Sequence, residues 1–123
     1  MTPSQLVRRL QAGLAFGELE TLRESLGVTM DRLASALGLS KATLHRRKLA
    51  GRLDPAESDR VVRFARLLGK AVVALETLGQ AREWLQSPQP GLGGAVPLEF
   101  AASEVGAREV EDLLTRIEYG VYA

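Results

Sequence analysis

Apolar residues recur every three or four positions in several segments of the chain, as they do along one face of an α-helix. Such stripes lie within residues 3–11, 18–26, 30–37 and 107–120. Leu, Val and Ala supply most of these apolar positions. No segment alternates apolar and polar residues in the manner of a half-buried β-strand. The pattern therefore predicts an all-α fold.

Residues 18–50 predict three short helices joined by two tight turns, which Gly27 and Gly38 mark. The last two of these helices lie within residues 29–50. Thr29 and Ser40 precede the two apolar stripes, and their hydroxyls suit the N-cap position. Gly38 permits the sharp turn between the helices. The small Ala34 allows the second helix to cross close to the first. Together these features predict a helix-turn-helix.

A longer helix is predicted from Asp54 to Leu78, with Asp54 at the N-cap and Pro55 at the first helical position. Its second half, Ala71–Leu78, is apolar nearly all round. A helix without a polar face needs burial, so we expect this stretch to pack against the rest of the chain or against a second subunit.

Residues 71–123 predict a small C-terminal helical domain, which begins within the long helix. Residues 87–97 contain three Pro and three Gly, which excludes regular structure there. A short helix is expected to begin at Pro97, and Gly106 is expected to separate it from the last helix. The predicted architecture is thus a helix-turn-helix bundle that a long helix joins to a C-terminal helical domain.

Charge divides the chain in two, although the net charge is only +1. Residues 1–70 hold 13 basic and 7 acidic residues, and residues 71–123 hold 3 and 8. A basic half favours a polyanion such as DNA, and chance unevenness is the alternative. We therefore expect a DNA-binding domain over 1–70 and a domain with another role over 71–123. The basic residues also cluster locally: Lys41, Arg46, Arg47, Lys48, Arg52, Arg60, Arg63, Arg66 and Lys70.

The second helix of the predicted helix-turn-helix has a face suited to DNA. An ordinary three-helix bundle with a solvated basic face is the alternative. Arg46 is the expected base contact, because a guanidinium pairs well with guanine. Arg47 either contacts DNA or pairs with an acidic neighbour. The candidate DNA-binding residues are Ser40, Lys41, Ala42, Thr43, His45 and Arg46.

Several chemistries find no support in the sequence. The chain has no cysteine and one histidine, which argues against disulfides, a thiol nucleophile, a metal cluster and a Ser-His-Asp triad. We expect His45 to face a DNA groove or solvent rather than act as a base. The glycines of residues 91–94 lack the Lys-Ser/Thr ending of a phosphate loop. We therefore expect no catalytic residue, metal or cofactor.

We expect the protein to be located in the cytoplasm. No apolar run approaches the roughly 18 residues that a membrane-spanning helix needs. The first residues, MTPSQLVRRLQAG, have no secretory apolar region.

The motifs of both halves resemble a known family. The helix-turn-helix resembles the Xre-like group, although that group commonly has an apolar residue where this chain has Arg47. The order Trp84-Leu85, Leu92-Gly93-Gly94, Pro97 and Gly106, with the ending Gly120-Val121-Tyr122-Ala123, closely resembles the toxin-binding domain of Xre/MbcA/ParS-type antitoxins. The resemblance covers roughly residues 15–123.

This resemblance implies an antitoxin whose partner is a RES-domain toxin, an enzyme that destroys NAD⁺. It implies that the C-terminal region covers the toxin's active site, and that the protein forms a homodimer and represses its own promoter. A stand-alone dimeric helix-turn-helix regulator is the alternative. An enzyme is a third possibility, but the sequence shows no assembled nucleophile, no set of metal ligands and no cofactor-binding loop that would support it.

The last residues are the candidate toxin contacts. Apolar side chains at a chain end are better explained by burial against a partner than by exposure to solvent. We expect Glu118 and the carboxylate of Ala123 to meet cationic groups of the toxin. The alternative is that Tyr119 and Val121 fold back onto their own domain. The candidate toxin-binding residues are Glu118, Tyr119, Gly120, Val121, Tyr122 and Ala123.

Overall fold

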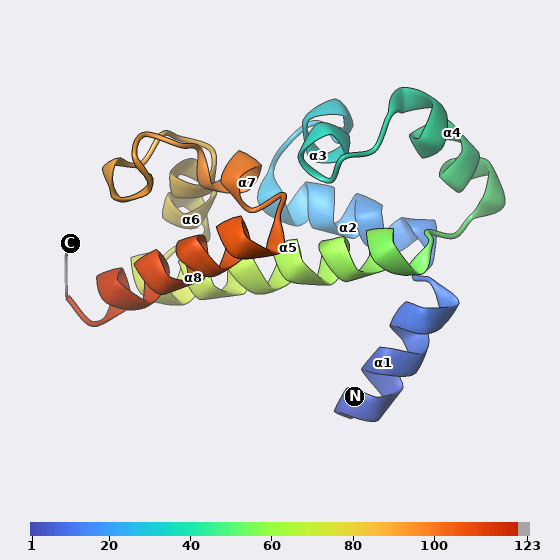
Figure 1. The fold of residues 1–123 in the computed structure, drawn as a ribbon, viewed down its shortest axis with the longest axis horizontal. Helices are drawn as coiled ribbons and strands as arrows, with labels where there is room; N and C mark the ends of the chain where they lie inside the picture. The colour runs from blue at the N-terminus through green and yellow to red at the C-terminus, as the bar shows by residue number, and fades with distance from the viewer. Residues whose placement is uncertain (121–123) are drawn as a thin grey trace. The chain divides into compact units, whose positions relative to one another are not determined.

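A computed structural model of the protein describes residues 1–120 (Figure 1). These residues form eight α-helices and one short 3-10 helix, and they contain no strand. The prediction of an all-α fold is confirmed. The chain divides into two compact units, Met1–Val62 and a second unit from Arg63 onward. Helix α5 (Pro55–Leu75) contributes its first part to one unit and the remainder to the other.

The first unit contains the predicted helix-turn-helix. Thr29 and Ser40 cap α3 and α4, each with a side-chain oxygen that accepts a backbone N–H at 3.1 Å. Gly38 adopts a φ of 74°, which a residue with a side chain rarely adopts. Ala34 and Leu39 are buried, as a close crossing of the two helices requires. The helices of this unit before α5 are α1 (Pro3–Ala12), α2 (Phe16–Leu26), α3 (Met30–Ala36) and α4 (Lys41–Ala50).

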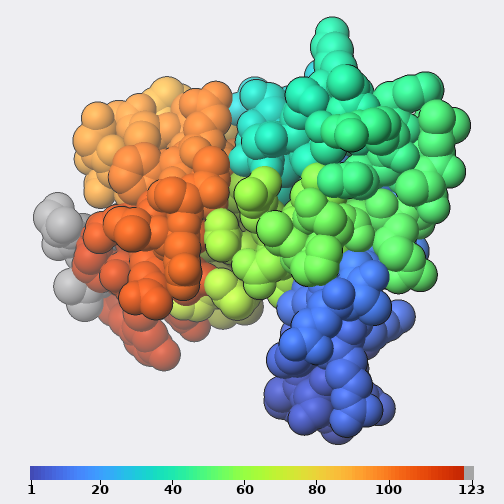
Figure 2. All heavy atoms as spheres, turned by 45° about the vertical axis from the view of Figure 1, so that its right-hand side comes forward, coloured from blue at the N-terminus to red at the C-terminus, as the bar shows by residue number. Residues whose placement is uncertain are grey.

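Helix α1 stands apart from the other helices of this unit (Figures 1 and 2). It has no buried residue. The chain that follows it is held by Arg52, whose Nη1 donates to the carbonyl of Gly13 at 2.6 Å. The backbone N–H of Leu14 donates to Ser58 Oγ at 2.8 Å, and Ser58 is fully buried. The attachment of α1 therefore depends on residues about 40 positions away in the sequence.

The second unit is built around α8, whose inward face buries Ala107, Val110, Leu113 and Leu114. Gly91 lies against Leu113, with no room for a larger side chain unless Leu113 moves. The segment expected to lack regular structure holds one turn of 3-10 helix, so that prediction is wrong over three residues. The elements that follow α5 are α6 (Leu78–Leu85), η1 (Pro90–Leu92), α7 (Pro97–Phe100) and α8 (Glu104–Glu118).

Helix α5 ends at Leu75, three residues before the predicted end. Glu76 adopts a left-handed φ of 79°, which stops the helix. Thr77 then caps a new helix, because its side-chain oxygen accepts the N–H of Gln80 at 3.1 Å. The apolar run Ala71–Leu78 thus spans a helix end, a turn and a helix start.

The predicted burial of this run is wrong within the chain for most of its length. Ala71 is fully buried, but Val73 is 63% exposed and Leu78 is 41% exposed. The turn at Glu76 redirects the chain, so residues 71–78 do not form one continuous buried helix. Burial of Val73 and Leu78 in a second subunit stays a prediction.

Gly106 does not separate two helices, as the sequence had suggested; it lies in the first turn of α8. Its N–H donates to Ser103 Oγ at 3.0 Å, and Ser103 is the N-cap. A Cβ at this position would collide with the carbonyl oxygen of Phe100. The glycine therefore allows α7 and the start of α8 to approach closely.

Within residues 1–120, none of the helices is long and apolar enough to cross a membrane.

Candidate functional site

The predicted DNA-binding residues lie together on the first turns of α4. Lys41, Ala42, His45 and Arg46 are exposed, and Thr43 is half-buried. No α4 residue is buried. The first turns of α4 thus present two formal cations and no acid to solvent, which suits contact with phosphates and base edges.

Hydrogen bonds link three of these side chains. Ser40 Oγ lies 3.0 Å from Thr43 Oγ1, to which its hydroxyl donates. Thr43 Oγ1 also accepts from Arg46 Nη2 at 3.2 Å. The cap at the start of α4 therefore also holds the guanidinium of Arg46, and the predicted base contact is partly positioned before any ligand binds.

Arg47 pairs with acidic residues rather than facing solvent beside Arg46. Its Nε donates to Glu57 Oε1 at 2.7 Å, and its Nη2 donates to Asp54 Oδ2 at 3.3 Å. The hydrogen bond with Glu57 raises the pKa of Arg47 above its usual value, against the opposite effect of desolvation. Of the two interpretations of Arg47, pairing with an acidic neighbour is the one that the structure bears out.

The acids that hold Arg47 also cap α5. Asp54 Oδ1 accepts the N–H of Glu57 at 2.7 Å, and Glu57 Oε1 accepts the N–H of Asp54 at 2.9 Å. This reciprocal pair is a capping box. Because Glu57 is only 6% exposed, its charge needs Arg47 as a partner. The pair therefore ties the second half of α4 to the start of α5.

Arg60 supports the turn of the helix-turn-helix, a role that the sequence did not suggest. Its Nη1 donates to the carbonyl oxygen of Leu37 at 2.8 Å, at the end of α3. A cation is favourable there because helix carbonyls are left without partners at a C-terminus. The two residues are 23 positions apart, and no local pattern could have paired them.

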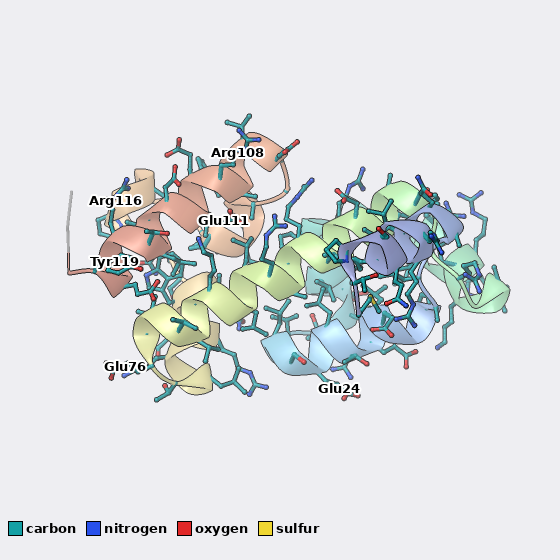
Figure 3. All side chains as sticks on the ribbon, turned by 90° about the horizontal axis from the view of Figure 1, so that it is seen from below. Glu24, Glu76, Arg108, Glu111, Arg116 and Tyr119 are labelled. Atoms are coloured by element: carbon teal, nitrogen blue, oxygen red, sulfur yellow. The ribbon has the colours of Figure 1, made fainter. Side chains whose placement is uncertain are left out.

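Part of the predicted basic cluster is used inside the second unit. Arg66 Nε pairs with Glu111 Oε1 at 2.9 Å, and Lys70 Nζ donates to Thr115 Oγ1 at 3.2 Å. Figure 3 shows Glu111 on the side of α8 that faces α5. By sequence, Arg66 and Lys70 belong to the basic cluster that favours DNA. In the structure these two residues instead hold α5 to α8. The cationic surface of α4 is the part of the cluster that suits DNA.

Three of the six candidate toxin-binding residues are described by the structure, at the end of α8 and directly after it. Glu118, Tyr119 and Gly120 are exposed, and Tyr119 is 74% exposed (Figure 3). The alternative in which Tyr119 packs back onto its own domain is therefore wrong. The remaining candidates, Val121, Tyr122 and Ala123, lie outside the described residues.

Two family models match the chain, one in each half. Residues 5–66 match the antitoxin Xre-like helix-turn-helix domain. Residues 71–120 match the antitoxin Xre/MbcA/ParS C-terminal toxin-binding domain.

Curated relatives match over most of the chain. An Antitoxin Xre of Yersinia enterocolitica is 32% identical over 120 residues, which cover 96% of this chain and 81% of the relative. A Prs ADP-ribosylating antitoxin of Sphingobium is 28% identical over 132 residues, covering 99% of this chain and 83% of the relative. An Antitoxin Xre of Photorhabdus laumondii is 35% identical over 72 residues, covering 58% of this chain and 49% of the relative.

Proposed function

The chain belongs to the Xre/MbcA/ParS family of antitoxins, and from this premise we propose that it neutralises a RES-type, NAD⁺-degrading toxin and represses its own promoter. The observation that carries the proposal is that one chain contains both a helix suited to DNA and a domain of the toxin-binding family. An exposed, cationic α4 suits DNA, and a toxin-binding domain follows it. In this proposal residues 1–70 bind DNA and residues 71–123 bind the toxin.

On DNA, α4 enters the major groove with its N-terminal end. Arg46, held by Thr43, contacts a base edge, while Lys41 and His45 lie on the same exposed face. Ser40 and Ala42 lie at the start of the helix, where the backbone approaches the phosphates. Because one helix-turn-helix contacts only a half-site, a homodimer binds an inverted repeat.

The exposed apolar side chains near the end of α5 support a dimer. Val73 and Leu78 remain outside the core of their own chain, and burying them in a second copy would remove this apolar surface from water.

On the toxin, the end of α8 and the residues after it cover the active site. Exposed Tyr119 serves as an aromatic anchor, and Glu118 meets a cation that would otherwise hold a phosphate of NAD⁺. The Sphingobium relative is named for ADP-ribosylation, a reaction that also consumes NAD⁺. The toxin class proposed is therefore an NAD⁺-consuming enzyme. The antitoxin acts by occlusion, without catalysis, in the cytoplasm.

Co-expression with the product of the adjacent gene tests this function. We expect the two proteins to copurify in a fixed ratio, and the complex to leave cellular NAD⁺ intact when the toxin alone depletes it. A promoter fragment should bind to the antitoxin in a gel-shift assay, and light scattering should report a dimer. DNA binding without any copurifying toxin would instead favour a stand-alone regulator.

A further inference from the structure

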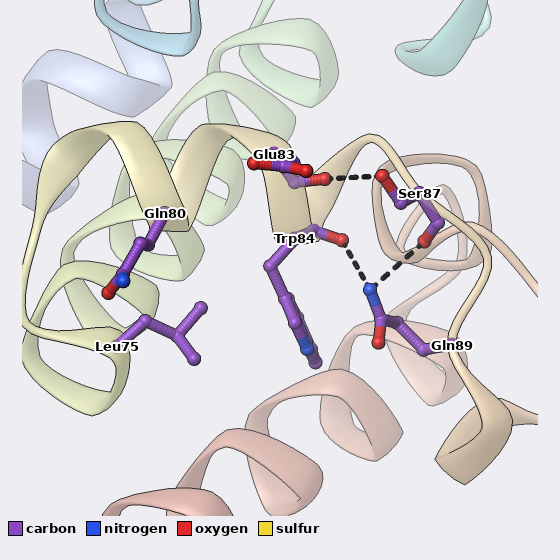
Figure 4. A pocket seen from close by; sticks show the side chains of 6 residues that line it. All are labelled: Leu75, Gln80, Glu83, Trp84, Ser87 and Gln89. Atoms are coloured by element: carbon purple, nitrogen blue, oxygen red, sulfur yellow. Dashed lines mark hydrogen bonds between the residues drawn. The ribbon is translucent and has the colours of Figure 1, made fainter.

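A hollow of about 370 Å³ lies beside Trp84 in the second unit (Figure 4). It is formed by the end of α5, by α6 and by the segment that follows α6. Among the described residues that line it, two are apolar, one is acidic and none is basic. They are Leu75, Gln80, Glu83, Trp84, Ser87 and Gln89.

The hydrogens of two polar side chains at the hollow are already used. Gln89 Nε2 donates to the carbonyl oxygens of Trp84 at 2.9 Å and Ser87 at 3.2 Å. Both amide hydrogens are thus occupied, which leaves Gln89 Oε1 as an acceptor. Ser87 Oγ donates its hydrogen to the carbonyl oxygen of Glu83 at 2.7 Å. Figure 4 shows these three bonds on the side of the hollow that Gln89 forms.

The remaining polar groups at the hollow include both donors and acceptors. The side-chain amide of Gln80 offers two N–H donors and one acceptor oxygen. The Glu83 carboxylate is exposed, and a carboxylate only accepts hydrogen bonds. The indole N–H of Trp84 is a donor, but it lies at the tip of the ring, away from Glu83 and Gln80 (Figure 4). The hollow therefore offers an aromatic face, an apolar wall, the amide of Gln80, and the acceptor oxygens of Gln89 and of the negatively charged Glu83.

This lining selects the chemistry of its occupant. An anion would be repelled by Glu83, and a purely apolar side chain would leave the acceptors without donors. Arginine has an apolar stem for Leu75 and a planar guanidinium that stacks on Trp84. Its five N–H groups suit the acceptor oxygens of Glu83, Gln80 and Gln89. Lysine has the charge but lacks the planar group that stacks.

We propose that the hollow beside Trp84 receives an arginine side chain from the toxin. The proposal rests on the proposed function, because it assigns the arginine to that partner. It adds to the tail a second contact point on the same unit, formed by α6 instead of by the end of α8. The negative charge of Glu83 also orients the encounter, since it attracts a cationic side chain.

The chain's single tryptophan gives a direct readout of the hollow without the toxin. The full chain is titrated with acetyl-argininamide, and the matched control is the uncharged acetyl-citrullinamide. We expect a saturable change in Trp84 fluorescence with the arginine compound only. Glu83→Gln should weaken this binding by about 1.5-fold to fivefold, as the loss of an exposed charge pair predicts. Equal responses to the two compounds would overturn the proposal.

Toxin affinity gives the second readout. Glu83→Gln and Trp84→Leu should weaken toxin binding, the latter about tenfold, while promoter binding stays unchanged. Glu99→Gln removes an exposed acid outside the hollow and should leave the toxin affinity unchanged. Circular dichroism checks the fold of Trp84→Leu, and Glu83→Gln alters only an exposed side chain.

The two readouts separate the failure of this inference from the failure of the proposed function. If the unaltered chain does not bind the toxin, the proposed function fails, and the fluorescence titration still decides whether the hollow prefers arginine. A hollow that prefers arginine, in a chain whose Glu83→Gln variant binds the toxin as tightly as before, would overturn the assignment of the arginine to the toxin.

Discussion

Arg46 and Arg47 are neighbours in the sequence with different roles. Arg46 is exposed and donates a hydrogen bond to Thr43, whereas Arg47 forms ion pairs with Glu57 and Asp54. On a helix, successive residues are rotated by about 100°, so adjacent arginines face different surroundings. One faces the space where DNA would lie, and the other faces the start of α5.

Substitution of the two arginines should separate DNA binding from stability. Arg46→Ala should reduce discrimination between promoter and unrelated DNA by about 1–3 kcal/mol, because a bidentate base contact is lost. Its melting temperature should stay unchanged. Arg47→Ala should lower the melting temperature by a few degrees, since it leaves the nearly buried Glu57 without its cation. Thermal melts and competition gel shifts measure the two effects.

The reverse pattern would contradict this division of roles. An Arg46→Ala protein that binds its promoter as selectively as before would exclude Arg46 as the base contact. An Arg47→Ala protein with an unchanged melting temperature would show that its pair with Glu57 contributes little.

At the scale of the elements, the close approach of α7 and α8 requires a residue without a side chain at position 106. Gly106 lies in the first turn of α8, where a Cβ would meet the Phe100 carbonyl oxygen. Because that atom belongs to the backbone, it cannot move aside as a flexible side chain would. The start of α8 would have to shift to accommodate any larger residue.

Two alanine substitutions should therefore have opposite effects. Gly106→Ala should destabilise the protein by about 1–3 kcal/mol, as overpacking of a core does. Gly69→Ala, inside α5, should stabilise it by about 0.5–1 kcal/mol, because nothing lies within 4 Å of the added Cβ and alanine favours helix. Urea unfolding measures both changes. Equal effects of the two substitutions would exclude the contact at Phe100 as the cause.

At the scale of the whole molecule, the residues proposed to contact DNA and those proposed to contact the toxin belong to separate units. The exposed cations of α4 belong to the first unit, and Tyr119 and Glu118 belong to the second. Loss of one set should therefore leave the other function intact. DNA binding should also weaken steeply with salt, because each phosphate contact releases counterions.

Deletion of residues 120–123 should weaken toxin binding without affecting DNA. The deletion leaves Tyr119 in place but removes Tyr122, the second aromatic candidate contact. Because an aromatic interface anchor commonly contributes about 2 kcal/mol, we expect toxin affinity to fall about thirtyfold. Promoter binding and the oligomeric state should not change. Calorimetry with the toxin, gel shifts and light scattering measure the three quantities. A truncated protein that still protects cells from the toxin at equal expression would exclude these residues as the inhibitory element.

Sequence reasoning succeeded where the determining contacts are local. Thr29, Ser40 and Gly38 were assigned correctly, because a cap or a left-handed turn depends on residues within three or four positions. The exposed face of α4 followed from helical periodicity alone. The end of α5 was misplaced because the apolar run continues through Glu76 without any Gly or Pro to mark the turn.

Sequence by itself thus determined the all-α class, the helix-turn-helix and the exposed face of α4, since these arise from periodicity and from caps. Only the tertiary structure decided that Arg47 pairs with Glu57, that Gly106 admits a backbone carbonyl, and which side chains surround Trp84. Such contacts join residues on different elements. The packing of the helices decides which residues meet, and no periodicity in the sequence indicates that packing. The partners in these contacts could therefore not be predicted.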